Sequence, residues 1–151
     1  MIIITGVSGG IGSELVYHLK KFDKVIGIYN KVKPKKKISN VEFIKCDITN
    51  KKQLQNLEKK IKFDKFITFL SLAGTKNDNL LINQNFNQID QTINVNIRSN
   101  IFLTKLIINK MIFSKWGRII FFSSTGALRG DVGTSAYSAS KTALYGLSKV
   151  I

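Results

Sequence analysis

The feature of this 151-residue sequence that most constrains its fold is a regular alternation of two kinds of segment. Short runs rich in Ile, Val and Phe are typical of strands, and they occur at Ile2–Thr5, Lys24–Tyr29, Val41–Cys46, Lys65–Leu70 and Arg118–Ser123. Longer segments with helical periodicity follow at Ile11–Phe22, Lys51–Ile61, Asn85–Ser114 and from Ser135 onward. Strands that alternate with helices pair in parallel through right-handed crossovers. We therefore predict one α/β domain over residues 1–151, a three-layer, doubly wound parallel sheet of about five strands.

The apolar residues within these segments indicate which faces are buried. Most of the predicted strands are apolar at successive positions, as in parallel sheets that are covered on both faces. In the long third helix a repeat of about four residues predicts one buried stripe, formed by Ile89, Ile93, Ile97, Ile101, Ile108, Met111 and Ile112. The last helical pattern still continues at Ile151, and the fifth strand would be a bare sheet edge, so we expect a domain that is incomplete at its C-terminus.

Composition excludes several other classes of protein. No apolar run reaches the ~18 residues of a membrane-spanning helix, and the N-terminus lacks the basic segment of a secretory signal. A lone Cys46 cannot form an internal disulfide, and a lone His18 has no second His for a metal pair. We therefore expect a cytoplasmic protein with no membrane partner and no metal site.

The formal charge of +15 raises the alternative of a nucleic-acid binder. Only three of the 24 basic residues are Arg, whose planar fork is favoured for reading bases and phosphates. We interpret the charge as a solvated, lysine-rich surface that can bind polyanions without specificity, and we expect no specific nucleic-acid partner.

A glycine cluster directly follows the first predicted strand, in the run Thr5-Gly6-Val7-Ser8-Gly9-Gly10-Ile11-Gly12. Gly6 can adopt a tight turn, Gly10 lets a phosphate approach the main chain, and Gly12 lets the next helix pack closely on the strand. Because backbone N–H groups at a helix N-terminus bind anions, the position of the cluster predicts a pyrophosphate-binding turn. The alternative is a tight strand-to-helix turn without a ligand.

This run resembles the Thr-Gly-x-x-x-Gly-Ile-Gly signature of the short-chain dehydrogenases/reductases. Gly9 also satisfies the Gly-x-x-Gly-x-x-Gly spacing of the larger epimerase and dehydratase subgroup, so the loop leaves both subgroups open. The resemblance implies a Rossmann-type fold and a nicotinamide dinucleotide in contact with Thr5, Gly6, Ser8, Gly10, Ile11 and Gly12.

The end of the second strand reads Gly27-Ile28-Tyr29-Asn30-Lys31 and carries no acidic residue to bind the ribose 2′-hydroxyl of NAD. Lys31 together with Lys33 could instead attract a 2′-phosphate, so NADP(H) is favoured over NAD(H), and Asn30 is a further candidate for cofactor contact. The alternative is that the basic run Lys31–Lys37 is simply an exposed loop. Asp47, followed by Ile48, matches the aspartate on the adenine side in the family, with an N-cap of the next helix as its alternative.

A Lys that follows a Tyr by four residues lies on the same helix face as that Tyr. The ammonium of the Lys then favours loss of the phenol proton. All four Tyr residues of this chain have Lys at that spacing, so the pair alone does not identify a site. Only Tyr137 has a Ser thirteen residues upstream, Ser124, and only Tyr137 lies in the run Ser135-Ala136-Tyr137-Ser138-Ala139-Ser140-Lys141. The alternative is a buried, hydrogen-bonded Tyr.

The segment from Gly117 to Gly146 resembles the catalytic block of the same family. The resemblance implies that Tyr137 exchanges a proton with the substrate oxygen while Ser124 hydrogen-bonds that oxygen. It further implies that Lys141 assists Tyr137 and binds the nicotinamide ribose, and that Asn96 holds a water of the proton relay. For Asn96 the alternative is an ordinary polar residue at a helix kink.

Two departures from the family pattern qualify the functional hypothesis. Where the family has Asn-Asn-Ala-Gly this chain has Ser71-Leu72-Ala73-Gly74, although Ala73 and Gly74 still permit close approach of a cofactor. The chain also matches only the first part of a usual family member. We therefore expect an oxidoreductase acting on a small carbonyl or alcohol, a dimer or tetramer when full-length. The alternatives are a truncated, inactive or binding-only Rossmann domain and a sugar-nucleotide epimerase or dehydratase.

Overall fold

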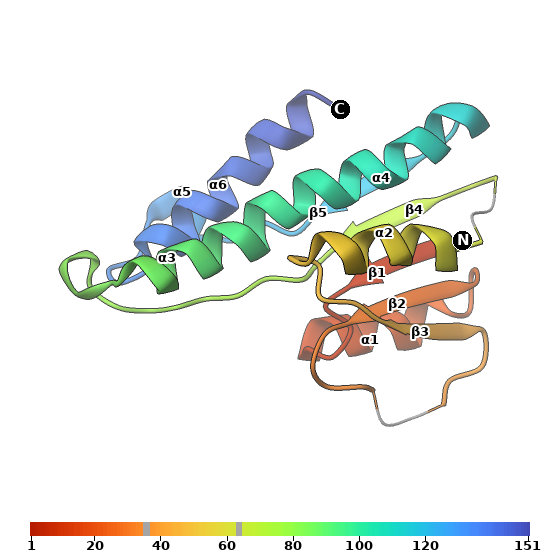
Figure 1. Ribbon diagram of the computed structural model, residues 1–151, viewed down its shortest axis with the longest axis horizontal. Helices are drawn as coiled ribbons and strands as arrows, with labels where there is room; N and C mark the ends of the chain where they lie inside the picture. Colours follow the sequence, from red (N-terminus) through yellow and green to blue (C-terminus); the bar gives the residue numbers. More distant parts are fainter. Residues whose placement is uncertain (35–36, 63–64) are drawn as a thin grey trace.

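The computed structural model describes residues 1–34, 37–62 and 65–151 (Figure 1). Its strands are β1 (Ile2–Thr5), β2 (Val25–Tyr29), β3 (Val41–Lys45), β4 (Thr68–Ser71) and β5 (Arg118–Phe121). Its helices are α1 (Gly10–Leu19), α2 (Lys51–Lys60), α3 (Phe86–Ile93), α4 (Ser99–Ser114), α5 (Gly126–Arg129) and α6 (Ser135–Lys149), with a 3₁₀ turn η1 (Leu81–Asn83) and a π-helical turn η2 (Asn94–Arg98).

The five strands form one sheet in the order β3-β2-β1-β4-β5, and every neighbouring pair is parallel. The chain runs outward from β1 to β3 and then returns to place β4 on the other side of β1. A sheet wound in this way has a crevice at the carboxyl ends of β1 and β4, where the winding reverses. The predicted doubly wound parallel sheet is confirmed.

Separate apolar clusters cover the two faces of the sheet. On one face Ile3, Ile28 and Phe69 pack with residues of α2 and α4. On the other face Ile4 and Leu70 pack with residues of α1. Helices on both faces give the three layers predicted from sequence. The last helix, α6, packs beside α3 and η2 (Figure 1).

The single long helix predicted over Asn85–Ser114 is in fact two helices joined by the π-helical turn η2. The predicted isoleucine stripe is wrong in its second half, because Ile101 is 48% exposed and Ile112 is 67% exposed. Met111 is buried as predicted, and the other buried apolar positions of α4 are Leu103 and Ile107. A π-helical turn closes its hydrogen bonds over one extra residue, so it rotates the buried face of the helix that follows.

Other predicted boundaries differ by one to three residues. The fourth strand begins at Thr68, and the predicted last helix ends at Lys149 rather than continuing to Ile151. The edge strands β3 and β5 are not buried at successive positions, in contrast to the three inner strands. The short elements η1 and α5 have no counterpart in the prediction. None of the described helices combines the length and apolarity needed to span a bilayer.

Candidate active site and cofactor cavity

The turn between β1 and α1 requires glycine at two positions. Gly6 has a φ of +76°, and a Cβ atom there would lie 2.9 Å from the backbone of Ala73. A Cβ atom at Gly12 would lie 2.3 Å from the carbonyl oxygen of Gly6. At Gly10, by contrast, a Cβ atom would meet nothing within 4 Å. The turn is therefore tightly packed on its inner side and open at Gly10, where the sequence predicts that a phosphate approaches.

Thr5, at the end of β1, holds the backbone of the segment that follows β4. Its side chain is buried, and its hydroxyl oxygen accepts hydrogen bonds from the backbone N–H groups of Leu72 (3.1 Å) and Ala73 (3.0 Å). These bonds fasten the segment after β4 to β1. Thr5 is not among the described residues that line the cavity below, so it shapes the crevice from underneath.

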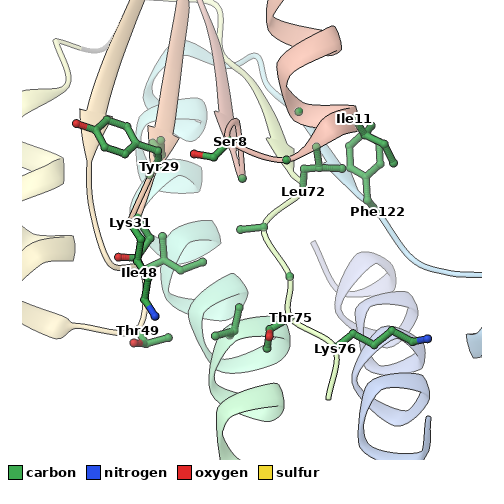
Figure 2. A pocket seen from close by; sticks show the side chains of 18 of the residues that line it. Ser8, Ile11, Tyr29, Lys31, Ile48, Thr49, Leu72, Thr75, Lys76 and Phe122 are labelled. Atoms are coloured by element: carbon green, nitrogen blue, oxygen red, sulfur yellow. The ribbon is translucent and has the colours of Figure 1, made fainter. Parts of the chain in front are cut away.

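A cavity of about 680 Å³ opens over the carboxyl ends of the central strands (Figure 2). Most of the residues singled out from sequence line it: Gly6, Ser8, Gly10, Ile11, Gly12, Asn30, Lys31, Asp47, Ile48, Ala73, Gly74, Tyr137 and Lys141. Sequence reasoning missed further lining residues, among them Thr49, Leu72, Thr75, Lys76 and Phe122. Figure 2 shows Lys31 toward one end of this cavity and Lys76 toward the other.

The end of the cavity beside β2 and β3 contains Asn30, Lys31 and Asp47. The alternative interpretation of Asp47 as a helix N-cap is wrong, because Asn50 caps α2 by accepting from the backbone N–H of Gln53. Asp47 instead accepts hydrogen bonds from the N–H (2.9 Å) and the hydroxyl (2.7 Å) of Thr49. Lys35 and Lys36 of the predicted basic run lie outside the described residues.

The opposite end of the cavity contains Tyr137 and Lys141, one turn apart on α6. The ammonium nitrogen of Lys141 lies 5.9 Å from the centroid of the Tyr137 ring and donates a hydrogen bond of 2.7 Å to the carbonyl oxygen of Phe122. Lys141 is only 5% exposed, and this burial lowers its pKa. The fold thus places a buried cation beside a half-buried phenol at the cavity wall.

Asn96 lies in the π-helical turn η2 and is buried. Its side-chain oxygen accepts from the backbone N–H of Thr75 (2.8 Å), and its side-chain nitrogen donates to the carbonyl oxygen of Thr75 and the hydroxyl of Ser140 (both 2.9 Å). A Cβ atom at Gly74 would lie 3.3 Å from Asn96 Oδ1 and 3.4 Å from Lys141 Nζ. The side chains of Asn96 and Lys141 therefore both lie close to Gly74, and Asn96 comes from the π-helical turn.

Ser124 is placed differently from the other predicted catalytic residues. Its hydroxyl oxygen accepts a hydrogen bond of 3.2 Å from the N–H of Gly126. It lines an adjoining groove of about 620 Å³ beside β5 and is not among the described residues that line the main cavity. The structure therefore brings Tyr137, Lys141 and Asn96 together and places Ser124 in the adjoining groove.

A buried polar contact begins at Ser71, where the family pattern has an asparagine. The hydroxyl of Ser71, at the end of β4, hydrogen-bonds the side-chain oxygen of Asn100 on α4. The side-chain nitrogen of Asn100 donates a hydrogen bond of 2.8 Å to the carbonyl oxygen of Asn96. A buried polar chain thus connects the central sheet to the π-helical turn. No local signal marks Asn100, because its role depends on a partner 29 residues away.

Comparisons with known proteins identify the family of this chain. The family model described as short chain dehydrogenase matches residues 1–151, and the chain belongs to that family. It is 33% identical to the 3-oxoacyl-[acyl-carrier-protein] reductase FabG of Rickettsia typhi, over 97% of this chain and 63% of that relative. The chain thus spans less than two thirds of the length of this curated relative.

Two solved structures are similar in fold and in sequence. A structure of ElxO Y152F with NADPH bound has a TM-score of 0.88 and 26% identity, covering 97% of this chain and 64% of that one. The aldohexose dehydrogenase of Thermoplasma acidophilum has a TM-score of 0.87 and 27% identity, covering 99% of this chain and 59% of that one.

Proposed function

We propose that this chain forms the cofactor-binding and catalytic part of an NADP(H)-preferring oxidoreductase that interconverts a carbonyl and an alcohol. The observation that carries the proposal is that Tyr137 and the buried Lys141 line the same cavity as the glycine turn after β1. A phenol beside an ammonium is suited to proton transfer, and a glycine turn at a helix N-terminus is suited to a pyrophosphate.

The residues present fit a dinucleotide. The turn is closed at Gly6 and Gly12 and open at Gly10, so Gly10 with Ser8 and Ile11 would receive the pyrophosphate. Asp47 and Ile48 would contact the adenosine, and Ala73 and Gly74 would leave room for the other half. When bound, the nicotinamide supplies or accepts the hydride of the reaction.

A preference for NADP(H) is supported by the end of the cavity beside β2, where Asn30 and Lys31 stand and the strand end carries no carboxylate to repel a 2′-phosphate. The solved relative ElxO Y152F has NADPH bound. Replacing Lys31 with Ala should therefore weaken binding of NADPH more than binding of NADH. Lys59→Ala, at an exposed position on α2, is the matched control and should change neither.

The side chains would act as follows during reduction of a carbonyl. Tyr137 would donate its phenolic proton to the substrate oxygen, and the ammonium of Lys141 would stabilise the phenolate that remains. Asn96, which fixes Thr75 and Ser140, would hold a water that returns the proton. Ser124 would hydrogen-bond the substrate oxygen, which requires its hydroxyl to turn from the groove beside β5 toward Tyr137.

The substrate is proposed to be a small carbonyl or alcohol compound, and the complete protein to be a dimer or tetramer. The experiment that tests the function follows loss of NADPH absorbance against a panel of ketones and aldehydes. Tyr137→Phe should lower turnover by roughly a hundredfold or more. The matched control is Tyr145→Phe, an exposed Tyr on the same helix with its own Lys four residues later, which should leave turnover unchanged.

Equal turnover after Tyr137→Phe would contradict the mechanism. NADPH binding without turnover of any carbonyl would instead favour a domain that only binds the cofactor. Nicotinamide dinucleotide that stays bound throughout purification would favour the epimerase or dehydratase alternative.

A further inference from the structure

A second lysine reaches Tyr137 from a distant part of the sequence. The ammonium nitrogen of Lys76, in the segment after β4, lies 5.7 Å from the centroid of the Tyr137 ring, about as near as that of Lys141. The proximity of Lys76 does not come from helical spacing, since 61 residues separate it from Tyr137. It is fixed by the fold, because the N–H of Asn79 donates to the carbonyl oxygen of Gly133 (2.9 Å), just before α6.

The ammonium of Lys76 is held by an ion pair, and this ion pair favours its charged form. Its ammonium forms an ion pair of 2.6 Å with Asp78, and this hydrogen bond raises the pKa of Lys76. The pKa of Lys141 is lowered by burial. Lys76 therefore keeps its proton to a higher pH than Lys141 does.

The other charges around Tyr137 do not replace Lys76. Asp131 precedes α6 and forms an ion pair of 3.2 Å with Arg129 of α5. The elements packed against α6 also carry Asp90 on α3 and Arg98 in η2, and the Arg98 guanidinium lies over the Phe102 ring instead (5.8 Å). Among the residues that the structure describes, the cations that lie within 6 Å of the Tyr137 ring centroid are Lys76 and Lys141.

We propose that Lys76 is a positioning residue that, together with Lys141, stabilises the phenolate form of Tyr137. An ammonium near an aromatic ring is attracted to its π face, and the attraction grows when the ring carries the negative charge of a phenolate. The catalytic meaning of this contact rests on the proposed function of Tyr137, whereas the contact itself can be measured in the protein without cofactor or substrate.

The test is a titration of tyrosinate absorbance, with the Tyr137 component identified as the one that is lost in Tyr137→Phe. Lys76→Met should move the midpoint of that component upward by about half a pH unit, the size of one screened charge at ~6 Å. Lys76→Arg retains the charge and should restore the midpoint. Circular dichroism and melting should be unchanged in both variants, because the Lys76 side chain is about half exposed.

The matched control is Lys149→Met, because the ammonium of Lys149 lies 5.0 Å from the ring of Tyr145 on the same helix. This control should leave the Tyr137 component in place. An unchanged midpoint in Lys76→Met, or a shift in Lys76→Arg as large as that in Lys76→Met, would overturn the proposal. Neither result would bear on whether Tyr137 is required for turnover, so the two proposals fail separately.

Discussion

At the scale of one residue, the buried charge of Lys141 lowers the stability of the folded chain. Its ammonium is almost fully buried with a carbonyl oxygen as a hydrogen-bond partner, and the pKa is lowered because burial disfavours the charged form. Between this lowered value and the ordinary value of 10.5, the unfolded chain binds the proton more tightly than the folded chain does. The contribution of Lys141 to stability is therefore unfavourable near neutral pH and improves as the pH rises through that window.

We predict that Lys141→Met melts at a temperature equal to or above that of the wild type at pH 7. The substitution removes a buried charge and keeps a side chain of similar length. The difference in melting temperature should shrink as the pH rises toward the ordinary lysine pKa of 10.5, because the wild type then also loses the charge. Lys149→Met, at an exposed position on the same helix, should show no such trend. A Lys141→Met protein that melts well below the wild type at every pH would contradict this account.

Thr5 makes a second residue-scale prediction. Thr5→Val keeps the shape of the side chain but leaves the N–H groups of Leu72 and Ala73 without their acceptor. We expect the free energy of unfolding to fall by about 1–3 kcal/mol in denaturant titrations, the cost of buried unpaired donors. Thr5→Ser keeps the hydroxyl and should lose less, and an equal loss in the two variants would show that packing rather than hydrogen bonding matters at this position.

At the scale of elements, sequence reasoning succeeded where the signal is local. The alternation of strands and helices and the tight glycine turn after β1 both follow from patterns within short segments, whereas the choice of Tyr137 among four Tyr-Lys pairs stays a prediction. The π-helical turn was missed because its extra residue leaves no mark in the apolar repeat, and the repeat therefore misplaced Ile101 and Ile112. The contacts of Asn100 and Lys76 were missed because both depend on tertiary packing.

The strand β5 supplies the element-scale prediction, because in the described sheet it pairs only with β4 and presents a free edge. Exposed apolar strand edges promote association. Ile120→Lys places a charge on this strand and should reduce concentration-dependent light scattering. Phe22→Lys, which also removes an exposed apolar side chain but lies away from the sheet edge, is the control. Equal reductions in the two variants would mean that general hydrophobicity, and not the strand edge, drives association.

At the scale of the whole molecule, the described parts combine a positively charged chain with a cavity that contains Lys31 and Lys76. Both features favour a bound anion, and the glycine turn gives the anion a defined place. The family assignment, the sheet order and the cavity agree with one another. The central claim is that this cavity binds a nicotinamide dinucleotide through the turn at Gly10.

The most direct test of that claim is a titration with NADPH of the wild type and two matched glycine variants. Gly10→Ala and Gly146→Ala both add a methyl group to a helix at a position with nothing within 4 Å, so both should fold. Gly10 lines the cavity, whereas Gly146 is exposed on α6. We predict saturable binding in the wild type and in Gly146→Ala, and binding weakened about tenfold or more in Gly10→Ala. Wild-type protein that shows no saturable binding, or Gly10→Ala that binds as tightly as Gly146→Ala, would contradict the account.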